Sequence, residues 1–225
     1  MSLLRTALAI CRKDLQTELR SREVVPVMVV FALIAGALWN FALDPAREAL
    51  PQVFPGLLWL TVFFAGMLGV YRSFFGEVRG GTLAGLMLAP VDRAAIYYGK
   101  LFANAVLLLL LEAVAVPAYF LFFDYRPAGR PLALVPVLLL GTVGFAATGT
   151  LLAALAAATR AGEALLPVLL FPVLVPLVLG VVQVTRGVLD PGAVQDAGLW
   201  LRLLVAYDAA ALALPYVLFE SLVEV

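Results

Sequence analysis

The chain has 225 residues, of which 64% are hydrophobic and 13% charged, with 15 basic and 15 acidic side chains. Soluble globular proteins are about 45–50% apolar and about 25% charged, so this composition excludes a soluble domain and indicates an integral membrane protein. The chain has no histidine and one cysteine, Cys11. These counts exclude a Ser-His-Asp triad, a histidine ligand to zinc or haem, and an intrachain disulfide. The sequence contains no block of basic residues of the kind that would predict binding to nucleic acid.

Residues 1–23 carry the pattern of an amphipathic helix that precedes the first hydrophobic run. Apolar residues recur at i, i+4, i+7, i+11 and i+15, and basic residues fall on the flank and back of that stripe. The pattern predicts an elbow helix in the headgroup plane, with its apolar side toward the lipid and its basic side toward anionic headgroups. The alternative is that these basic residues only anchor the chain on the cytoplasmic side of the membrane. Both interpretations place the segment at the same membrane surface. The stripe consists of Leu4, Leu8, Cys11, Leu15 and Leu19.

Six hydrophobic runs are long enough to cross a membrane as helices. A hydrocarbon core about 30 Å thick requires about 20 apolar residues in a helix. The sequence therefore predicts an all-α integral membrane protein in which residues 1–225 form one domain. The predicted spans are residues 24–43, 53–71, 101–123, 132–158, 164–185 and 199–219.

The distribution of basic residues predicts the orientation of these spans. Lysine and arginine accumulate in the cytoplasmic flanks of membrane proteins. Here the residues before the first span, the loop between spans two and three, and the turn between spans four and five hold ten, and the opposite side holds five. Both termini are therefore expected in the cytoplasm, and no cleavable signal peptide is expected because the first apolar run after Arg5 is too short.

Residues 77–100 form a polar segment between spans two and three, on the predicted cytoplasmic side. Gly80 and Gly81 interrupt the chain there, and Asp92 is placed to cap the helix that leads into the third span. Two interpretations stand: a short helix that docks in the groove of a partner protein, and an interfacial loop that rests on lipid. The short helix would begin at Thr82, present the apolar face Leu83, Leu86 and Met87, and end at Pro90.

Two acidic residues lie within predicted membrane spans, where an ionised side chain is energetically unfavourable. Glu112 is near the middle of the third span and Asp208 near the middle of the sixth. An ionised acid at the centre of a membrane helix costs about 2.5–3.5 kcal/mol on insertion scales, and such residues are functional by default. Each is expected to be protonated, hydrogen-bonded to backbone or to Ser or Thr, or directed at a polar cavity or a partner. A purely structural role, in which a protonated acid joins helices, is the alternative.

The fifth span contains Pro167, Pro172 and Pro176. A proline inside a helix removes a backbone hydrogen bond and kinks or interrupts the helix. The three prolines predict either a hinge or a passively kinked packing helix, since proline is common in membrane spans. In the fourth span, Gly141, Gly144 and Gly149 predict close packing of helices.

An amphipathic elbow, six spans and a cytoplasmic helix between spans two and three resemble the layout of ABC-2 type transporter permeases. Within that group the chain is similar to the haem exporter protein B family, CcmB, of cytochrome c maturation. Tyr71 departs from the family pattern, in which an acidic residue is expected before Arg72. The resemblance rests on "RKDLQTELRSRE" (12–23), "FPGLLWLTVFFAGMLGVYRSF" (54–74), "GGTLAGLMLAPVDRAAIYYGKLFAN" (80–104) and "LPVLLFPVLVPLVLG" (166–180).

The resemblance implies a non-catalytic subunit of the inner membrane that works with a separate CcmA-like ATPase and with CcmC- and CcmD-like membrane proteins. It implies an indirect connection to a CcmE-like haem chaperone, whose haem-loaded form the complex releases, and leaves open whether haem crosses this subunit and whether the subunit forms a homodimer. The chain contains no Gly-x-x-x-x-Gly-Lys-Ser/Thr phosphate loop, so ATP is expected on the partner. No cofactor is expected on this chain, and haem associated with the complex would not be held by histidine. In the docking interpretation, Leu83, Leu86 and Met87 then form the coupling helix.

Two other functions remain open from the sequence. One is an ABC-2 exporter permease for a lipid or another small molecule. The second is an intramembrane hydrolase that uses Glu112 and Asp208. Two acids without a histidine, a group of metal ligands or a nucleophile motif make a poor active site, so the hydrolase is the weaker alternative.

Overall fold

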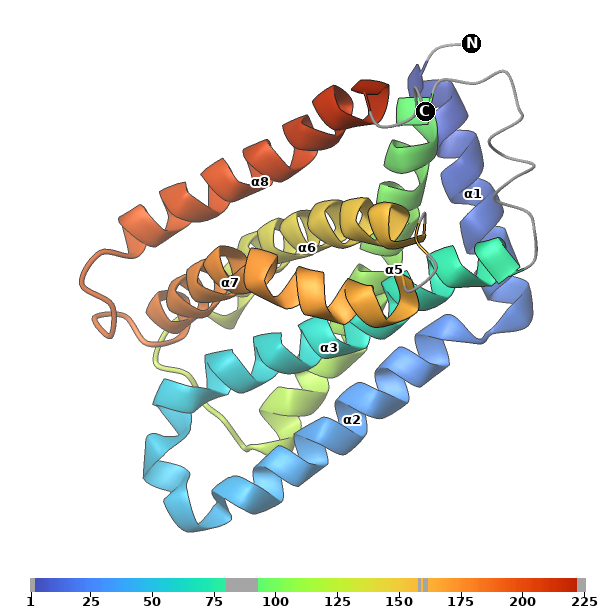
Figure 1. Ribbon diagram of the computed structural model, residues 1–225. Coiled ribbons are helices and arrows are strands. Elements are labelled where there is room, and N and C mark those ends of the chain that lie inside the picture. The colour runs from blue at the N-terminus through green and yellow to red at the C-terminus, as the bar shows by residue number, and fades with distance from the viewer. Residues whose placement is uncertain (1–2, 80–92, 158, 160–161, 222–225) are drawn as a thin grey trace.

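The computed structural model describes residues 3–79, 93–157, 159 and 162–221 of the chain. Over these residues the secondary structure is α-helices and two short 3-10 helices joined by loops, without a strand, which confirms the all-α prediction (Figure 1). The helices are α1 (Leu3–Ser21), α2 (Val24–Leu43), α3 (Leu50–Arg79), α5 (Arg93–Phe122), α6 (Leu134–Ala157), α7 (Gly162–Leu189) and α8 (Ala197–Ser221), with short 3-10 helices η1 (Asp44–Ala49) and η2 (Pro131–Ala133).

Within the described ranges, six helices are long and apolar enough to cross a membrane: α2, α3, α5, α6, α7 and α8. The six predicted spans are therefore confirmed as helices, with different ends. Helix α5 begins at Arg93, directly after Asp92, where the helix that leads into the third span was predicted to start, and eight residues before the hydrophobic run itself. Residues 93–100, predicted as part of the polar coupling segment, are thus the first two turns of α5.

Helices α3 and α6 form much of the interior, while α2 and α8 lie at opposite edges of the bundle (Figure 1). Helix α6 contacts α3, α5, α7 and α8. Its glycines permit this central position: a side chain at Gly141 would overlap Trp59 of α3, and one at Gly144 would overlap Asp208 of α8. Small residues that bring helix backbones together are a common means of packing in membranes, as was predicted for this span.

The Pro-Gly-x-x-Trp sequence at the start of α3 places Trp59 at the junction of three helices. Trp59 is fully buried, packs on Gly141 of α6 and donates a hydrogen bond from Nε1 to Thr185 Oγ1 of α7 at 2.8 Å. A buried indole requires such a partner for its N–H. Trp59 therefore joins α3, α6 and α7 through both packing and a polar contact.

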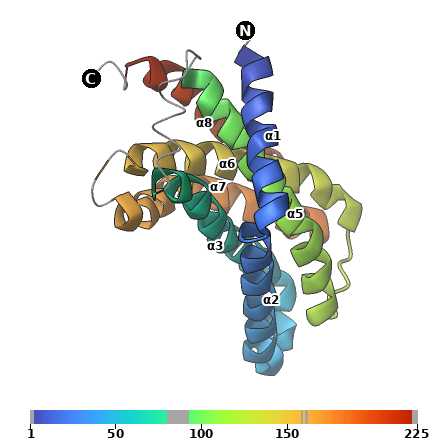
Figure 2. The same cartoon turned by 90° about the vertical axis from the view of Figure 1, so that its right-hand side faces the viewer.

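Helix α1 packs along the first half of α5 (Figure 2). Its buried residues are Ala7, Ile10 and Cys11, whereas Leu8 and Leu19 of the predicted leucine stripe are exposed. The helix thus has two apolar faces, one against the protein and one free of it. The free leucine face suits lipid, and the orientation of α1 in the headgroup plane stays a prediction.

The start of α1, the end of α8 and the start of α5 lie at one end of the bundle (Figures 1 and 2). A contact supports this placement, because the Tyr98 hydroxyl of α5 donates to Leu212 O near the end of α8 at 3.0 Å. An even number of crossings brings both ends of a chain to the same side of a membrane. Which side that is stays a prediction from the basic residues.

Labelling of single cysteines tests the orientation. In a Cys11→Ser background, cysteines that replace Arg5 or Arg93 should react with a membrane-impermeant maleimide only from the cytoplasmic side, and one that replaces Arg126 only from outside. Removing Cys11 eliminates labelling of the one native thiol. That thiol already reacts slowly, because burial, and secondarily the Asp14 carboxylate, raises its pKa. Labelling of position 93 from outside would contradict the six-span topology.

Candidate functional site

The predicted docking residues Thr82, Leu83, Leu86, Met87 and Pro90 lie outside the described residues. Their flanking helices are described: α3 ends at Arg79 and α5 begins at Arg93. These two helices also contact each other within the bundle. A force applied to the segment between them would therefore act first on α3 and α5.

Two tyrosines in the second turn of α5 contact two other helices. The Tyr97 hydroxyl donates to Ala147 O of α6 at 2.9 Å, and the Tyr98 hydroxyl donates to Leu212 O of α8 at 3.0 Å. Both acceptors are backbone carbonyls, so these contacts depend on the positions of the helices rather than on the identity of a partner side chain. The start of α5 is therefore held to two neighbouring helices.

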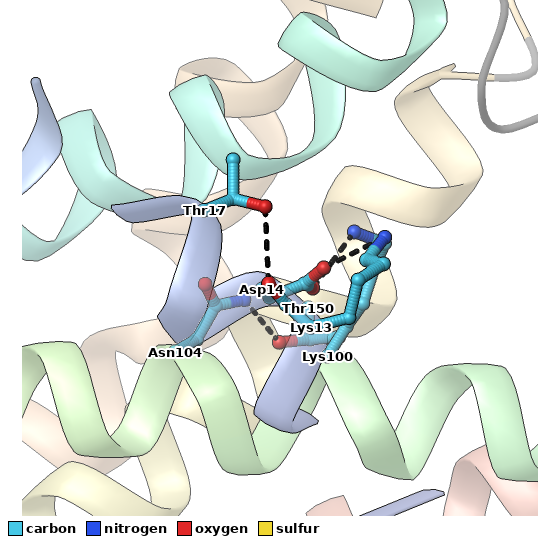
Figure 3. Close-up of polar contacts among 6 residues, drawn as sticks. All are labelled: Lys13, Asp14, Thr17, Lys100, Asn104 and Thr150. Atoms are coloured by element: carbon cyan, nitrogen blue, oxygen red, sulfur yellow. Dashed lines mark hydrogen bonds and ion pairs between the residues drawn. The ribbon is translucent and has the colours of Figure 1, made fainter. Parts of the chain in front are cut away.

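Lys100 and Asn104, one turn apart on α5, extend this set of contacts (Figure 3). Lys100 Nζ lies 3.3 Å from Asp14 Oδ2 of α1, and Lys100 is 0% exposed. The amide of Asn104 donates to Thr150 Oγ1 of α6 at 3.0 Å. Lys13 Nζ also contacts the Asp14 carboxylate, 2.8 Å from Oδ1. We call Tyr97, Tyr98, Lys100 and Asn104 the α5 hub.

The α5 hub was missed in the sequence because Lys100 lay at the edge of a polar segment and was counted only as a cytoplasmic charge. A signal for its partner existed. Ala7, Ile10, Cys11 and Asp14 are spaced i, i+3, i+4 and i+7, which is a second helical face beside the leucine stripe. An acid on an otherwise apolar face is the pattern expected of a residue that is paired inside the protein.

Glu112 lies in the membrane-spanning part of α5 with 2% of its surface exposed. Thr142 Oγ1 of α6 donates to Glu112 Oε1 at 2.8 Å. Among the described residues, Glu112 Oε2 has no hydrogen-bond partner. One of the predicted environments, a hydrogen bond to a threonine, is thus present on one oxygen, and the other oxygen is available for a further contact.

Asp208 lies on α8 with 5% of its surface exposed. It sits against Gly144 of α6, where any side chain would overlap its Oδ1. Within the described part of the chain neither carboxylate oxygen has a hydrogen-bond partner. A buried polar group without a partner is uncommon in native structures and indicates a site with a functional role or an unseen partner.

The two acids face α6 from different sides. Glu112 contacts Thr142 and Asp208 contacts Gly144, and two residues along a helix differ in direction by about 200°. Helix α6 therefore stands between the two carboxyl groups. This arrangement disfavours a hydrolase in which Glu112 and Asp208 act as a pair, because paired acid and base must reach the same substrate atoms.

Helix α7 continues as one helix from Gly162 to Leu189 through its three prolines, Pro167 included. Pro172 and Pro176 are exposed and share the outer face, whereas Leu174 and Leu177 are buried. The Tyr207 hydroxyl of α8 donates to Val173 O between those prolines at 3.2 Å. Pro172 and Pro176 thus lie on the outside of the bundle, and a hinge at this helix stays a prediction.

These features define a class of protein: a multi-pass helical membrane protein whose interior polar contacts connect its helices. In the described ranges, no group of three or more His, Cys, Asp or Glu side chains could hold a metal ion. A family model described as CcmB protein matches residues 5–224. The chain therefore belongs to the CcmB family.

Individual relatives agree with this assignment. The chain is 32% identical over 180 residues to heme exporter protein B of Rhodobacter capsulatus, an alignment that covers 80% of this chain and 82% of that protein. It is 30% identical over 207 residues to heme exporter protein B of Paracoccus denitrificans, with 92% and 93% of the two chains covered. The corresponding protein of Pseudomonas aeruginosa is 29% identical over 166 residues, or 72% of each chain.

Proposed function

We propose that this chain is the membrane permease subunit of a haem export system that serves cytochrome c maturation. The observation that carries the proposal is the family match over residues 5–224, which spans the six helices that, within the described residues, are long and apolar enough to cross a membrane. The relatives that carry the name heme exporter protein B align over most of their length. Haem is the cargo of the system in this proposal and not a resident cofactor of the chain.

The energy for transport comes from a partner in the proposed complex. The sequence has no Gly-x-x-x-x-Gly-Lys-Ser/Thr phosphate loop, so a CcmA-like subunit binds and hydrolyses ATP. CcmC- and CcmD-like membrane proteins complete the complex, which releases a haem-loaded CcmE-like chaperone. The subunit resides in the inner membrane with both termini in the cytoplasm, as the distribution of basic residues favours.

Each predicted site has a role in this proposal. Residues Thr82 to Pro90 form the coupling helix, and its apolar residues Leu83, Leu86 and Met87 enter a groove of the ATPase. Glu112 and Asp208, with three carboxylate oxygens that lack a partner among the described residues, supply polar contacts within the membrane during the transport cycle. The α5 hub begins at Tyr97, seven residues after Pro90 at the end of the proposed coupling helix, and passes displacement of that helix into the bundle.

Substitution of Leu86 tests the docking of the ATPase. We expect Leu86→Asp to abolish co-purification of the ATPase while the subunit still inserts in the membrane. A charge buried in an apolar groove costs several kcal/mol, more than a small contact supplies. The measurement is the amount of ATPase that co-purifies with an affinity-tagged subunit.

Leu19→Asp is the matched control, because Leu19 is exposed on α1, on the same predicted side of the membrane and outside the docking segment. It should retain the ATPase. Normal recovery of the ATPase with the Leu86 variant would contradict the coupling-helix assignment, and loss of the ATPase from both variants would show that any charge on this side disrupts the complex.

A further inference from the structure

Helix α1 packs closely on α5 at Gly99. A Cβ atom at Gly99 of α5 would lie 2.8 Å from Ala7 O and 2.7 Å from Ile10 Cβ of α1. Ala7 and Ala95, one turn before Gly99 on α5, are also fully buried. Close contact of this kind fixes the separation of two helices, and a buried charge pair between them also opposes their sliding past each other.

The ion pair between Asp14 and Lys100 restricts that sliding. Lys100 Nζ and Asp14 Oδ2 are 3.3 Å apart, with 1% and 13% of the two side chains exposed. A displacement of α1 relative to α5 would withdraw the carboxylate from a buried ammonium group, which is strongly unfavourable. Lys13 contacts the same carboxylate but is 45% exposed, so water can replace its contact.

The other end of α1 is joined to α2. The Glu18 carboxylate accepts hydrogen bonds from the backbone N–H groups of Val24 and Val25, each 2.9 Å from Oε1. Val24 and Val25 are the first residues of α2, where backbone N–H groups have no partner within the helix and a carboxylate is favoured. Arg22, with a φ of 52°, forms the turn between the two helices.

Helix α1 therefore contacts the first turns of two membrane-spanning helices, α5 and α2. One contact is with Gly99 and Lys100 of α5, beyond the proposed coupling helix that ends at Pro90, and the other is with the start of the first membrane span. We propose that α1 and residues 93–104 of α5 move as one body, so that α1 is an arm that carries displacement of the coupling segment to α2. Asp14 and Lys100 are the positioning residues of this arm. The inference rests on the proposed function for the source of the movement.

Distances between spin labels test the arm in the complex with its ATPase. In a Cys11→Ser background, labels replace exposed leucines: Leu8 on α1, Leu110 on α5 and Leu179 on α7. Leu110 lies six residues beyond position 104 on the same continuous helix, so its label reports the position of α5. Between the nucleotide-free complex and the complex with a non-hydrolysable ATP analogue, the distance from position 8 to position 110 should stay the same. The distance from position 8 to position 179 should shift by about 2 Å or more, the scale of helix shifts in switching proteins.

Two variants then test whether the ion pair is the joint. Lys100→Met removes the buried ammonium, and we expect the distance from position 8 to position 110 to broaden or to differ between the two nucleotide states. Lys13→Met removes the exposed ammonium on the same carboxylate and should leave that distance unchanged. The comparison of states with the native ion pair needs neither variant, so the test holds even if Lys100→Met fails to fold.

Three results would overturn the inference. They are a nucleotide-dependent distance between α1 and α5 with the native pair, an unchanged distance between α1 and α7, and equal behaviour of the Lys100 and Lys13 variants. Failure of the proposed function has a different signature, because the purified subunit would then carry no ATPase before any label is measured.

Discussion

Replacement of Trp59 by alanine should destabilise the protein more than any other single truncation in its interior. Trp59 is fully buried and joins α3 to α6 and α7. Truncation of a buried tryptophan costs about 3–5 kcal/mol in soluble proteins. We expect about 3 kcal/mol here, because helices in a membrane gain packing contacts on association but little from the exclusion of water. The measurement is unfolding of the reconstituted subunit in a denaturing detergent, followed by loss of helical signal.

Two controls separate packing from hydrogen bonding and from general sensitivity. Trp59→Phe keeps most of the packing on Gly141 and loses the hydrogen bond to Thr185, so it should cost about 1 kcal/mol. Trp200→Ala removes a partly exposed tryptophan at the start of α8 and should cost less than Trp59→Ala. Equal losses of stability for Trp59→Ala and Trp200→Ala would contradict the central position of Trp59.

Replacement of Glu112 by leucine should abolish release of the haem-loaded chaperone although the complex still assembles. Leucine suits a packed or lipid-facing helix, so insertion of α5 should be unaffected. The side chain of leucine cannot accept the hydrogen bond from Thr142 and has no polar atom where Glu112 Oε2 lies without a partner. The measurement is the ATP-dependent accumulation of covalent cytochrome c in cells that carry each variant, with recovery of the partners measured in parallel.

Further variants distinguish a functional role of the Glu112 carboxylate from a purely structural one. Glu112→Gln keeps the size and the Oε1 acceptor and removes the option of charge, so an activity that needs charge or proton exchange should be lost in it as well. Thr142→Val removes the donor to Glu112 Oε1 and keeps the shape, at a cost of about 0.5–1.5 kcal/mol. If Glu112→Leu and Asp208→Leu both support normal cytochrome c levels, the acids only join helices and belong to no site.

Several features of this protein follow from local sequence. The six hydrophobic runs required helices of about 20 residues, since no other backbone arrangement in these runs satisfies its hydrogen bonds in lipid. The glycines of α6 predicted close packing, and the structure places Gly141 and Gly144 at such contacts. The resemblance to the CcmB family came from short stretches distributed over most of the chain, and the family match over residues 5–224 confirms it.

Which residues meet was decided only by the tertiary structure. Asp14 and Lys100 are 86 residues apart in sequence, and each looked like an ordinary charge at a membrane surface. Glu18 and Arg22 are four residues apart, a spacing that permits an ion pair on one helix, yet the Glu18 carboxylate contacts the first N–H groups of α2. The reason is that helical periodicity determines which face a residue occupies but not which helix covers that face. The partner of a buried charge depends on how helices pack, and that is set by small residues such as Gly99 and Gly144 on the opposing helix.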